Sequence, residues 1–180
     1  GTKHVFTLDE NRTGTLLERA GALSDKFKTL PTKDDDLAAI LYTSGTTGRS
    51  KGAMLTHKNL SSNAQVLQKY WGWVKGDVLL HALPIFHVHG LFVAAHGALI
   101  NGSKMIWLPR LDIAQLIKHM PKSTVMMGVP TFYVRLLADK GFNKKVARNM
   151  RLFISGSAPL LTETFNAFKK LIGQPILERY

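Results

Sequence analysis

The sequence contains no cysteine, so it can form neither disulfide bonds nor thiolate metal sites. It also lacks a long apolar stretch. The longest, residues 90–100, is interrupted by His96 and falls short of the ~20 residues that a membrane span needs. No cleavable signal pattern opens the chain, which begins Gly1-Thr2 without an initiating methionine. We therefore expect a cytoplasmic protein with no membrane span, and we expect both ends to be cut from a longer polypeptide.

Acidic residues are scarce relative to basic ones. The chain carries 24 Lys and Arg against 12 Asp and Glu, a formal net charge of +12. Such an excess invites a nucleic-acid-binding function. However, the basic residues are scattered, without the long like-charge block or the aromatic-basic ladder of nucleic-acid-binding segments. A solvated basic surface that attracts anionic small molecules is favoured, with no nucleic-acid partner. A non-catalytic nucleotide- or nucleic-acid-binding module is the alternative from another class.

The most informative stretch is a loop rich in hydroxyls and glycines. It follows an apolar run at residues 37–42, which we expect to form a buried strand. Glycines let backbone amides approach a ligand closely, hydroxyls donate hydrogen bonds, and a lysine at the far end adds a positive charge. These are the groups that bind a run of phosphate oxygens. The residues expected to do so are Thr43, Ser44, Gly45, Thr46, Thr47, Gly48 and Lys51.

This loop is not a Walker A motif. A pattern that began at Gly45 would need glycine at position 50 and serine or threonine at position 52, where the chain has Ser50 and Gly52. A short apolar run, residues 53–55, follows where a Walker loop would lead into a helix. A plain polar turn between two strands is the alternative, but few such turns gather so many hydroxyls between two glycines and a lysine.

The segment from Tyr42 to Gly52 resembles the signature loop of the adenylate-forming enzymes, which include acyl-CoA synthetases, luciferases and the adenylation domains of peptide synthetases. The resemblance implies that the loop wraps the β- and γ-phosphates of ATP. It also implies Mg²⁺ and CoA as further ligands of the intact enzyme, and a C-terminal lid domain that this chain lacks. Ser50 departs from the commoner form of the signature, which has a more constrained proline there.

Strand-like and helix-like stretches alternate along the chain. Apolar runs near residues 77–83, 105–108, 125–129, 151–154 and 175–177 are separated by segments with one apolar helical face, such as Leu60, Ala64 and Leu67. Residues 90–100 are expected to form a buried helix, and residues 4–8 a short strand. The alternation predicts an α/β fold with a mainly parallel sheet flanked by helices, whose ligands lie at the carboxyl ends of the strands. We expect residues 1–36 to be a linker or partial N-terminal region. Residues 37–180 are expected to form an ATP- and carboxylate-binding subdomain.

Two histidines, His87 and His89, lie two residues apart after one of these predicted strands. The pair can ligate a metal, but no third ligand cluster is evident, so we expect no metal site. A histidine pair that caps the next helix is the structural alternative. The resemblance implies that this segment lines the carboxylate pocket. We assign His87 as the catalytic residue that contacts the substrate and regard His89 as less certain.

Two further segments are assigned to adenine binding by resemblance. The first is a turn of small residues, for which a tight strand-to-helix connection is the alternative. It comprises Gly156, Ser157, Ala158 and Pro159. The second, Glu178, Arg179 and Tyr180, resembles the opening of the next family motif. The threonine and glutamate of that motif, which contact the α-phosphate and magnesium, lie beyond the chain.

The substrate is narrowed by three segments that resemble the malonyl-CoA synthetases of this superfamily, at residues 81–94, 128–133 and 151–161. The resemblance implies that malonate, ATP and CoA become malonyl-CoA, AMP and pyrophosphate through a malonyl-adenylate. Methylmalonate or another short carboxylic acid is the alternative substrate. We expect residues 1–180 alone not to complete the reaction, and the sequence leaves the oligomeric state open.

A dicarboxylate substrate needs a cation for its distal carboxylate, and arginine has the fork geometry for this role. Arg110, just after a predicted strand, and Arg151, just before one, are the candidates, with Arg135 in reserve. A surface or ion-paired arginine is the alternative for each. Gly128 completes the group of residues assigned to the carboxylate substrate.

Overall fold

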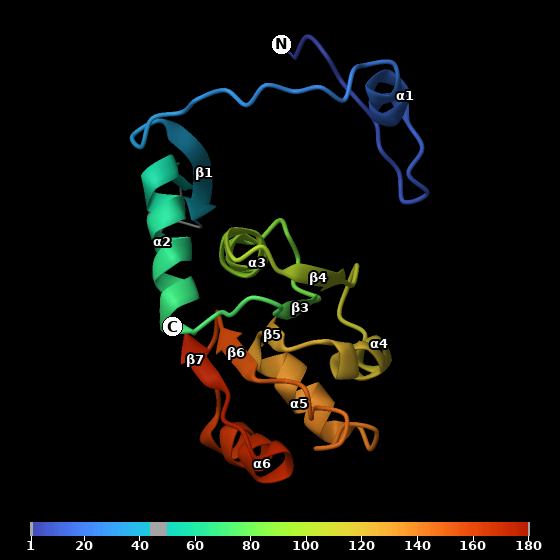
Figure 1. The fold of residues 1–180 in the computed structure, drawn as a ribbon, viewed down its shortest axis with the longest axis vertical. Helices are drawn as coiled ribbons and strands as arrows, with labels where there is room; N and C mark the ends of the chain where they lie inside the picture. Colours follow the sequence, from blue (N-terminus) through green and yellow to red (C-terminus); the bar gives the residue numbers. More distant parts are fainter. Residues whose placement is uncertain (1, 44–49, 180) are drawn as a thin grey trace. The chain divides into compact units, whose positions relative to one another are not determined.

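A computed structural model describes residues 2–43 and 50–179, which fall into two units that divide between Lys33 and Asp34 (Figure 1). The first unit contains one short helix, α1 (Thr15–Gly21), which buries none of its side chains. The backbone N–H of Thr7 donates a hydrogen bond to the Thr15 hydroxyl (3.0 Å) at the start of this helix. The sequence also suggested a strand at residues 4–8, but no strand forms in the described part of this unit.

The second unit begins with an antiparallel hairpin, β1 (Leu37–Thr43) and β2 (Lys51–Thr56). Thr43 pairs with Lys51, so the two ends of the connecting segment lie side by side. The expectation that the first strand is buried is wrong for the described residues, since Ile40 is 47% exposed and Tyr42 is 74% exposed. Within the described part of the chain, β1 pairs with β2 alone, and its apolar side chains Leu37, Ile40 and Tyr42 are exposed.

Helix α2 (His57–Tyr70) follows β2 directly and begins with a capping box. The Asn59 backbone N–H donates to the Thr56 hydroxyl (3.2 Å), and the Thr56 N–H donates to the Asn59 side-chain oxygen (3.0 Å). Ala64 is buried, as its helical spacing from Leu60 and Leu67 predicted. The helix therefore turns one face toward the rest of the unit.

A five-stranded sheet with the order β4-β3-β5-β6-β7 forms the centre of the second unit, and all its pairings are parallel. The strands are β3 (Val78–His81), β4 (Lys104–Trp107), β5 (Val125–Gly128), β6 (Leu152–Gly156) and β7 (Leu177–Arg179). The predicted α/β fold with a mainly parallel sheet is therefore confirmed. Strands β5 and β6 are buried along their whole length, which is why both are almost continuously apolar.

Helices pack on both faces of this sheet. On one face the Phe168 ring of α6 (Thr162–Ile172) lies 4.9 Å from the Phe153 ring and 5.5 Å from the Tyr133 ring of α5 (Pro130–Ala138). On the other face lies a π-helix, η1 (His89–Ala95), which continues into α3 (His96–Ile100). Helix α4 (Ile113–His119) and a 3₁₀ turn, η2 (Met120–Lys122), connect β4 to β5 (Figure 1).

A buried carboxylate joins the amino ends of three neighbouring strands. Asp77, which precedes β3, accepts hydrogen bonds from the Thr124 hydroxyl (2.8 Å) before β5 and from Arg151 Nε (2.7 Å) before β6. Its second oxygen accepts from the Val74 N–H (2.8 Å) and from the Arg151 guanidinium. Burial acts to raise the pKa of Asp77, but the hydrogen bonds from Arg151, Val74 and Thr124 prevail and lower it. The carboxylate therefore stays ionised at this end of the sheet.

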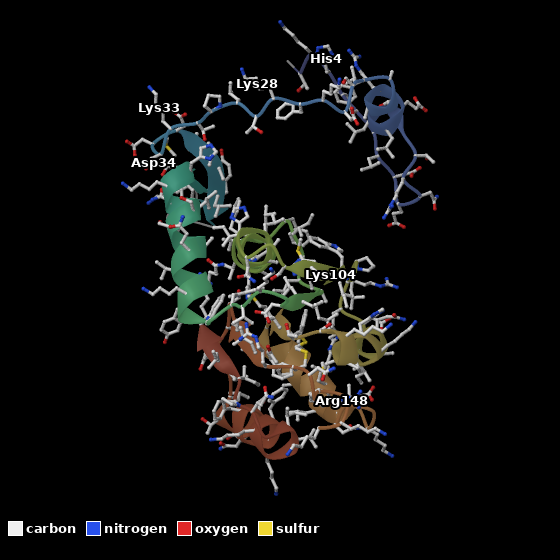
Figure 2. All side chains as sticks on the ribbon, in the orientation of Figure 1. His4, Lys28, Lys33, Asp34, Lys104 and Arg148 are labelled. Carbon is white, nitrogen blue, oxygen red and sulfur yellow. The ribbon has the colours of Figure 1, made fainter. Side chains whose placement is uncertain are left out.

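No helix in the described part of the chain is long and apolar enough to span a membrane. Basic side chains lie on different elements of the second unit, for example Lys104 on β4 and Arg148 after α5 (Figure 2). Lys104 and Arg148 do not contribute to the cavities next to η1 and α2.

We expect Asp77→Asn and Arg151→Ala each to lower the free energy of unfolding by about 3 kcal/mol, since each change leaves buried polar groups without a charged partner. Urea unfolding followed by circular dichroism measures the loss. Asp35→Asn, at an exposed position, is the matched control and should change stability by less than about 0.5 kcal/mol. Wild-type stability in both Asp77 and Arg151 variants would contradict a structural role for this pair.

Candidate functional site

Loops at the carboxyl ends of β3, β5 and β6 surround a cavity of about 220 Å³. The residues that line it come from the loop after β3, the first turn of η1, the start of α5 and the turn after β6. They are Leu83, Pro84, Phe86, His87, His89, Gly90, Val129, Phe132 and Ser157. His87 and Ser157, which sequence reasoning assigned to the carboxylate and to adenine, thus line one cavity, as expected for a ligand site at this edge of a parallel sheet.

His89 connects the two sides of this cavity. Its Nδ1 lies 3.1 Å from the Ser157 hydroxyl, and its backbone N–H donates to Nδ1 of His87 (3.1 Å). Because Nδ1 of His87 is an acceptor, a neutral His87 ring carries its proton on Nε2 and can donate it to a ligand. Ser157 has a left-handed backbone (φ 67°), an unusual conformation for a residue with a side chain. The contact with His89 helps to stabilise this backbone conformation of Ser157.

Two histidines are buried on this side of the sheet. His81 on β3 and His89 are each 1% exposed, and both nitrogens of His81 and Nε2 of His89 find no partner among the described atoms. The His81 ring packs edge-on against Trp107, with ring centroids 4.5 Å apart. Burial lowers the pKa of His81 to about 4. Burial, followed by the nearby Arg179, His87 and His81, lowers the pKa of His89 to about 4, so both rings are neutral near pH 7.

A glycine lets η1 approach the loop that precedes it. A Cβ built on Gly90 would lie 2.2 Å from the carbonyl oxygen of Pro84, closer than any side-chain carbon can come. Seven residues of π-helix begin at His89, and such turns are frequent at functional sites. The sequence predicted a buried helix over residues 90–100 but gave no sign of the π-helical part.

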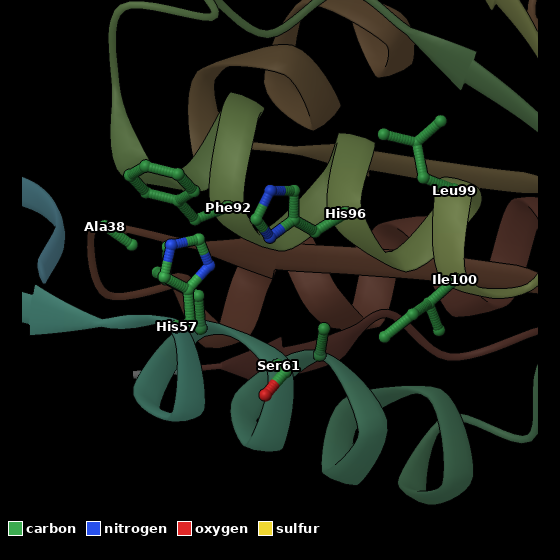
Figure 3. A pocket seen from close by; sticks show the side chains of 9 residues that line it. Ala38, His57, Ser61, Phe92, His96, Leu99 and Ile100 are labelled. Carbon is green, nitrogen blue, oxygen red and sulfur yellow. The ribbon is translucent and has the colours of Figure 1, made fainter. Parts of the chain in front are cut away.

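Two more cavities lie between α2 and the helix formed by η1 and α3. One, of about 250 Å³, has the polar side chains of Asn59, Asn63 and Arg179 on its walls. The other, of about 450 Å³, is mostly apolar. Figure 3 shows His57 and Ser61 of α2 on one side of it and Phe92, His96, Leu99 and Ile100 on the other. Leu60 and Phe92 line both cavities, so the two are neighbours.

The AMP-binding enzyme family matches residues 2–180. The chain belongs to this family. It is 39% identical over 159 residues to the mitochondrial malonate–CoA ligase of Mus musculus, an alignment that covers 79% of this chain and 27% of that protein. It is 35% identical to the malonate–CoA ligase of Arabidopsis thaliana, over 81% of this chain and 27% of that protein.

Solved structures of family members have the same fold. Apo MatB of Rhodopseudomonas palustris is 51% identical to this chain, with a TM-score of 0.95 over 98% of this chain and 35% of that one. The ATP-bound form of the same protein gives a TM-score of 0.92 over 97% and 35%. The chain therefore spans about a quarter to a third of the length of the relatives that it matches.

Several residues of the predicted family signature lie outside the described part of the chain. They are Ser44, Gly45, Thr46, Thr47, Gly48 and Tyr180. The backbones at the two ends of the signature loop, Thr43 and Lys51, pair across the hairpin. The assignment of the loop residues to the phosphates, and of Tyr180 to adenine, stays a prediction that follows from the family motifs.

The two arginines predicted to bind a carboxylate lie at different ends of the sheet. Arg151 precedes β6, at the amino ends of the strands, and its guanidinium binds Asp77. It does not line the His87 cavity, so a role as a substrate ligand has no support from its position. Arg110 follows the edge strand β4 at the same end as His87, but it is exposed and lines none of the three cavities. The reserve residue, Arg135, is exposed on α5.

The remaining predicted residues lie at the carboxyl ends of β5 and β6, in the turn after β6, and on β7. Gly128 ends β5, where a Cβ would lie 2.9 Å from the Phe132 ring. Gly156 ends β6, and a Cβ there would lie 3.1 Å from the His89 ring, so this glycine lets His89 approach the sheet. Ala158 and Pro159 continue the same turn. The Glu178 side chain accepts a hydrogen bond from the Leu160 N–H (2.9 Å), while Arg179 lines the cavity next to α2.

The sequence analysis assigned no role to His81 and regarded a role for His89 as less certain than one for His87. His81 is a histidine in the otherwise apolar strand Val78–His81, and this pattern could have identified it as a buried polar residue. The spacing of His87 and His89 was noted, but their separate roles depend on η1, whose π-helical start turns His89 inward and leaves His87 exposed.

We expect the free energy of unfolding to fall as the pH is lowered from about 6.5 to about 4. The pKa values of His81 and His89 are lowered in the folded protein, so in this range the unfolded chain binds protons that the folded protein does not. Each histidine contributes a slope of at most about 1.4 kcal/mol per pH unit. Urea unfolding at several pH values measures the profile.

His81→Leu should remove one of these two contributions and flatten the profile. His4→Leu, which changes an exposed histidine, should leave the slope unchanged. Equal slopes in wild type and His81→Leu would contradict a neutral, buried His81.

We expect Gly90→Ala to destabilise the fold by about 1–3 kcal/mol, because the added methyl group collides with the backbone of Pro84. Chemical unfolding gives the change in free energy. Gly21→Ala in α1 is the matched control: its Cβ meets nothing within 4 Å, so it should be neutral or slightly stabilising. A Gly90→Ala protein as stable as wild type would show that η1 does not depend on this close approach.

Proposed function

We propose that this chain is part of an acid–thiol ligase that converts malonate, ATP and CoA to malonyl-CoA, AMP and pyrophosphate. The observation that carries the proposal is the cavity at the carboxyl ends of β3, β5 and β6, where His87, His89 and Ser157 meet. Membership of the AMP-binding enzyme family and similarity to malonate–CoA ligases support the same reaction.

In the first half-reaction a carboxylate oxygen of malonate attacks the α-phosphorus of ATP. The bond to the bridging oxygen breaks, pyrophosphate leaves and malonyl-adenylate remains. Since Nδ1 of His87 accepts from the His89 N–H, the Nε2–H of His87 is free to donate to a substrate oxygen and orient it. Because burial keeps His89 neutral, it holds His87 and Ser157 without adding a charge of its own.

The phosphates are assigned to the loop that begins at Thr43 and ends at Lys51, through backbone amides, hydroxyls and the lysine ammonium group. Adenine is assigned to the turn after β6, where the small residues Gly156, Ala158 and Pro159 leave room for a planar ring. In the second half-reaction the CoA sulfur attacks the malonyl carbonyl carbon and AMP leaves. Mg²⁺ stays a prediction for the intact enzyme, and the described residues contain no group of three or more metal-binding side chains.

Methylmalonate is the second candidate substrate. A malonyl-CoA ligase with 35% identity to this chain and a TM-score of 0.77 over 82% of it was solved with methylmalonyl-CoA and AMP bound. That structure shows that a related site accepts one extra methyl group. A cytoplasmic location and the absence of a nucleic-acid partner stay predictions, with a nucleotide- or nucleic-acid-binding module as the alternative function.

The test measures pyrophosphate release by the intact protein with ATP and malonate, methylmalonate or acetate. We expect malonate to support the highest kcat/KM, and His87→Ala to lower the malonate-dependent rate by about 100-fold. The exposed His4→Ala should leave the rate unchanged. Residues 1–180 alone should not complete the reaction. An intact protein that releases no pyrophosphate with malonate, or a fully active His87→Ala protein, would contradict the proposal.

A further inference from the structure

The basic residues are scattered along the sequence, but the fold gathers many of them at one end of the sheet. Residues 118–173 carry ten Lys and Arg against two Asp and Glu, out of 24 and 12 in the whole chain. Parallel strands are joined by crossovers, so α4, α5 and α6 each lead back to the amino end of the next strand. The chain thus brings its basic segments to the end of the sheet opposite the His87 cavity.

Three of these segments contact one another at the amino ends of β5, β6 and β7. The Asn149 side chain donates a hydrogen bond to the Pro121 carbonyl oxygen of η2 (2.7 Å). The Gln174 side chain, which follows α6, donates one to the Met150 carbonyl oxygen (2.8 Å). Residues 139–151 therefore connect the segment after α4 with the segment after α6 (Figure 1).

The exposed cations of these segments form one surface, which we call the basic face. A Cβ on Gly173, at the end of α6, would lie 3.8 Å from Nζ of Lys144, so the cations of residues 139–151 and those of α6 are neighbours. Figure 2 shows Arg148 on the segment between α5 and β6. The basic face comprises Lys122, Lys144, Lys145, Arg148, Lys169 and Lys170, all of them exposed.

Carboxylates do not neutralise the basic face. Within the described part of the chain, none of its six side chains forms an ion pair. The two acidic residues of this region are engaged elsewhere. Asp139 accepts a hydrogen bond from the Gly141 N–H (2.7 Å), and Glu163 lies in the first turn of α6, at the opposite end of that helix from the basic face. The positive charge is therefore available to an anionic partner.

Helix ends explain only part of this charge. Lys169 and Lys170 lie in the last turn of α6, where cations interact favourably with the helix dipole. Lys144, Lys145 and Arg148 have no such role, because residues 139–151, all of which the structure describes, contain no helix. A surface that keeps these charges without a structural use for them is suited to bind an extended anion.

The side chains of the basic face fit a membrane better than a protein or a nucleic acid. Five of the six cations are lysines, which are depleted at protein interfaces and supply mobile point charges. No aromatic side chain of residues 118–173 is exposed, so the face offers no platform for stacked bases. Leu171, which is 39% exposed, follows Lys169 and Lys170 and adds an apolar side chain of the kind that enters a lipid interface.

We propose that the basic face binds the surface of an anionic membrane. Clusters of about four to eight lysines and arginines are sufficient for such binding, and each cation strengthens it about 5-fold. Binding at the amino ends of the strands leaves the His87 cavity, at their carboxyl ends, open to substrates. Membrane binding of this kind goes beyond the proposed function and is independent of which acid the site uses.

The test measures binding of the intact protein to lipid vesicles by co-sedimentation. The vesicles contain phosphatidylcholine alone or phosphatidylcholine with about 30% phosphatidylserine, at about 0.1 M and about 0.5 M salt. We expect binding to the anionic vesicles alone, and at the lower salt concentration alone. The variant Lys144→Gln/Lys145→Gln/Arg148→Gln should bind these vesicles about 100-fold more weakly. Lys169→Gln/Lys170→Gln, on the other side of the face, should bind them about 25-fold more weakly.

The matched control is Lys26→Gln/Lys28→Gln/Lys58→Gln, which removes three exposed charges outside the basic face. It should weaken vesicle binding by less than about 5-fold. Circular dichroism checks that each variant keeps the wild-type fold. Vesicle binding is measured without the reaction, so a failure of the proposed function leaves this test intact.

Three outcomes would overturn the proposal. The first is a wild-type protein that does not bind anionic vesicles. The second is equal weakening in the basic-face variants and in the control, because it indicates the net charge of the protein rather than this face. The third is tighter binding to a DNA or RNA duplex than to the anionic vesicles, at the same salt and phosphate concentrations, which would assign the face to a nucleic acid.

Discussion

The buried Asp77 carboxylate is the interaction on which the rest of the second unit depends. It joins the segments that enter β3, β5 and β6, and so fixes the relative positions of three parallel strands at their amino ends. Because the strands are only four or five residues long, this also fixes the positions of His81, Gly128 and Gly156 at their carboxyl ends. An ion pair thus holds the amino ends of the strands, and the His87 cavity lies at their carboxyl ends.

At the carboxyl ends of the strands, the positions of His87 and His89 depend on one element, η1. Its close approach to Pro84 through Gly90 and to the sheet through Gly156 buries His89 and leaves His87 exposed at the cavity. One histidine is therefore neutral and structural, and the other is available to a ligand. The same short segment lines the His87 cavity through His87 and His89, and lines the cavity that contains Arg179 through Val88.

Much of this arrangement was predictable from the sequence. Apolar runs ended by glycine or proline predicted the parallel strands, and the position of His87 after β3 placed it at the carboxyl edge. The arginines were not predictable in this way. Arg151 precedes a strand and Arg179 ends one, and only the tertiary structure shows that the first pairs with Asp77 while the second lines a cavity. Burial of the first strand was also mispredicted, because the apolar pattern of residues 37–42 does not reveal whether a second layer covers it in this chain.

Calorimetric titration of the intact protein with two non-hydrolysable adenylate analogues tests the central claim most directly. One analogue carries a malonyl group and the other a butyryl group, so they differ in the presence of a distal carboxylate. The account predicts that the malonyl analogue binds about 100-fold more tightly than the butyryl analogue, and that His87→Ala weakens the binding of both. Equal affinity of the wild-type protein for the two analogues would contradict a malonate-specific site.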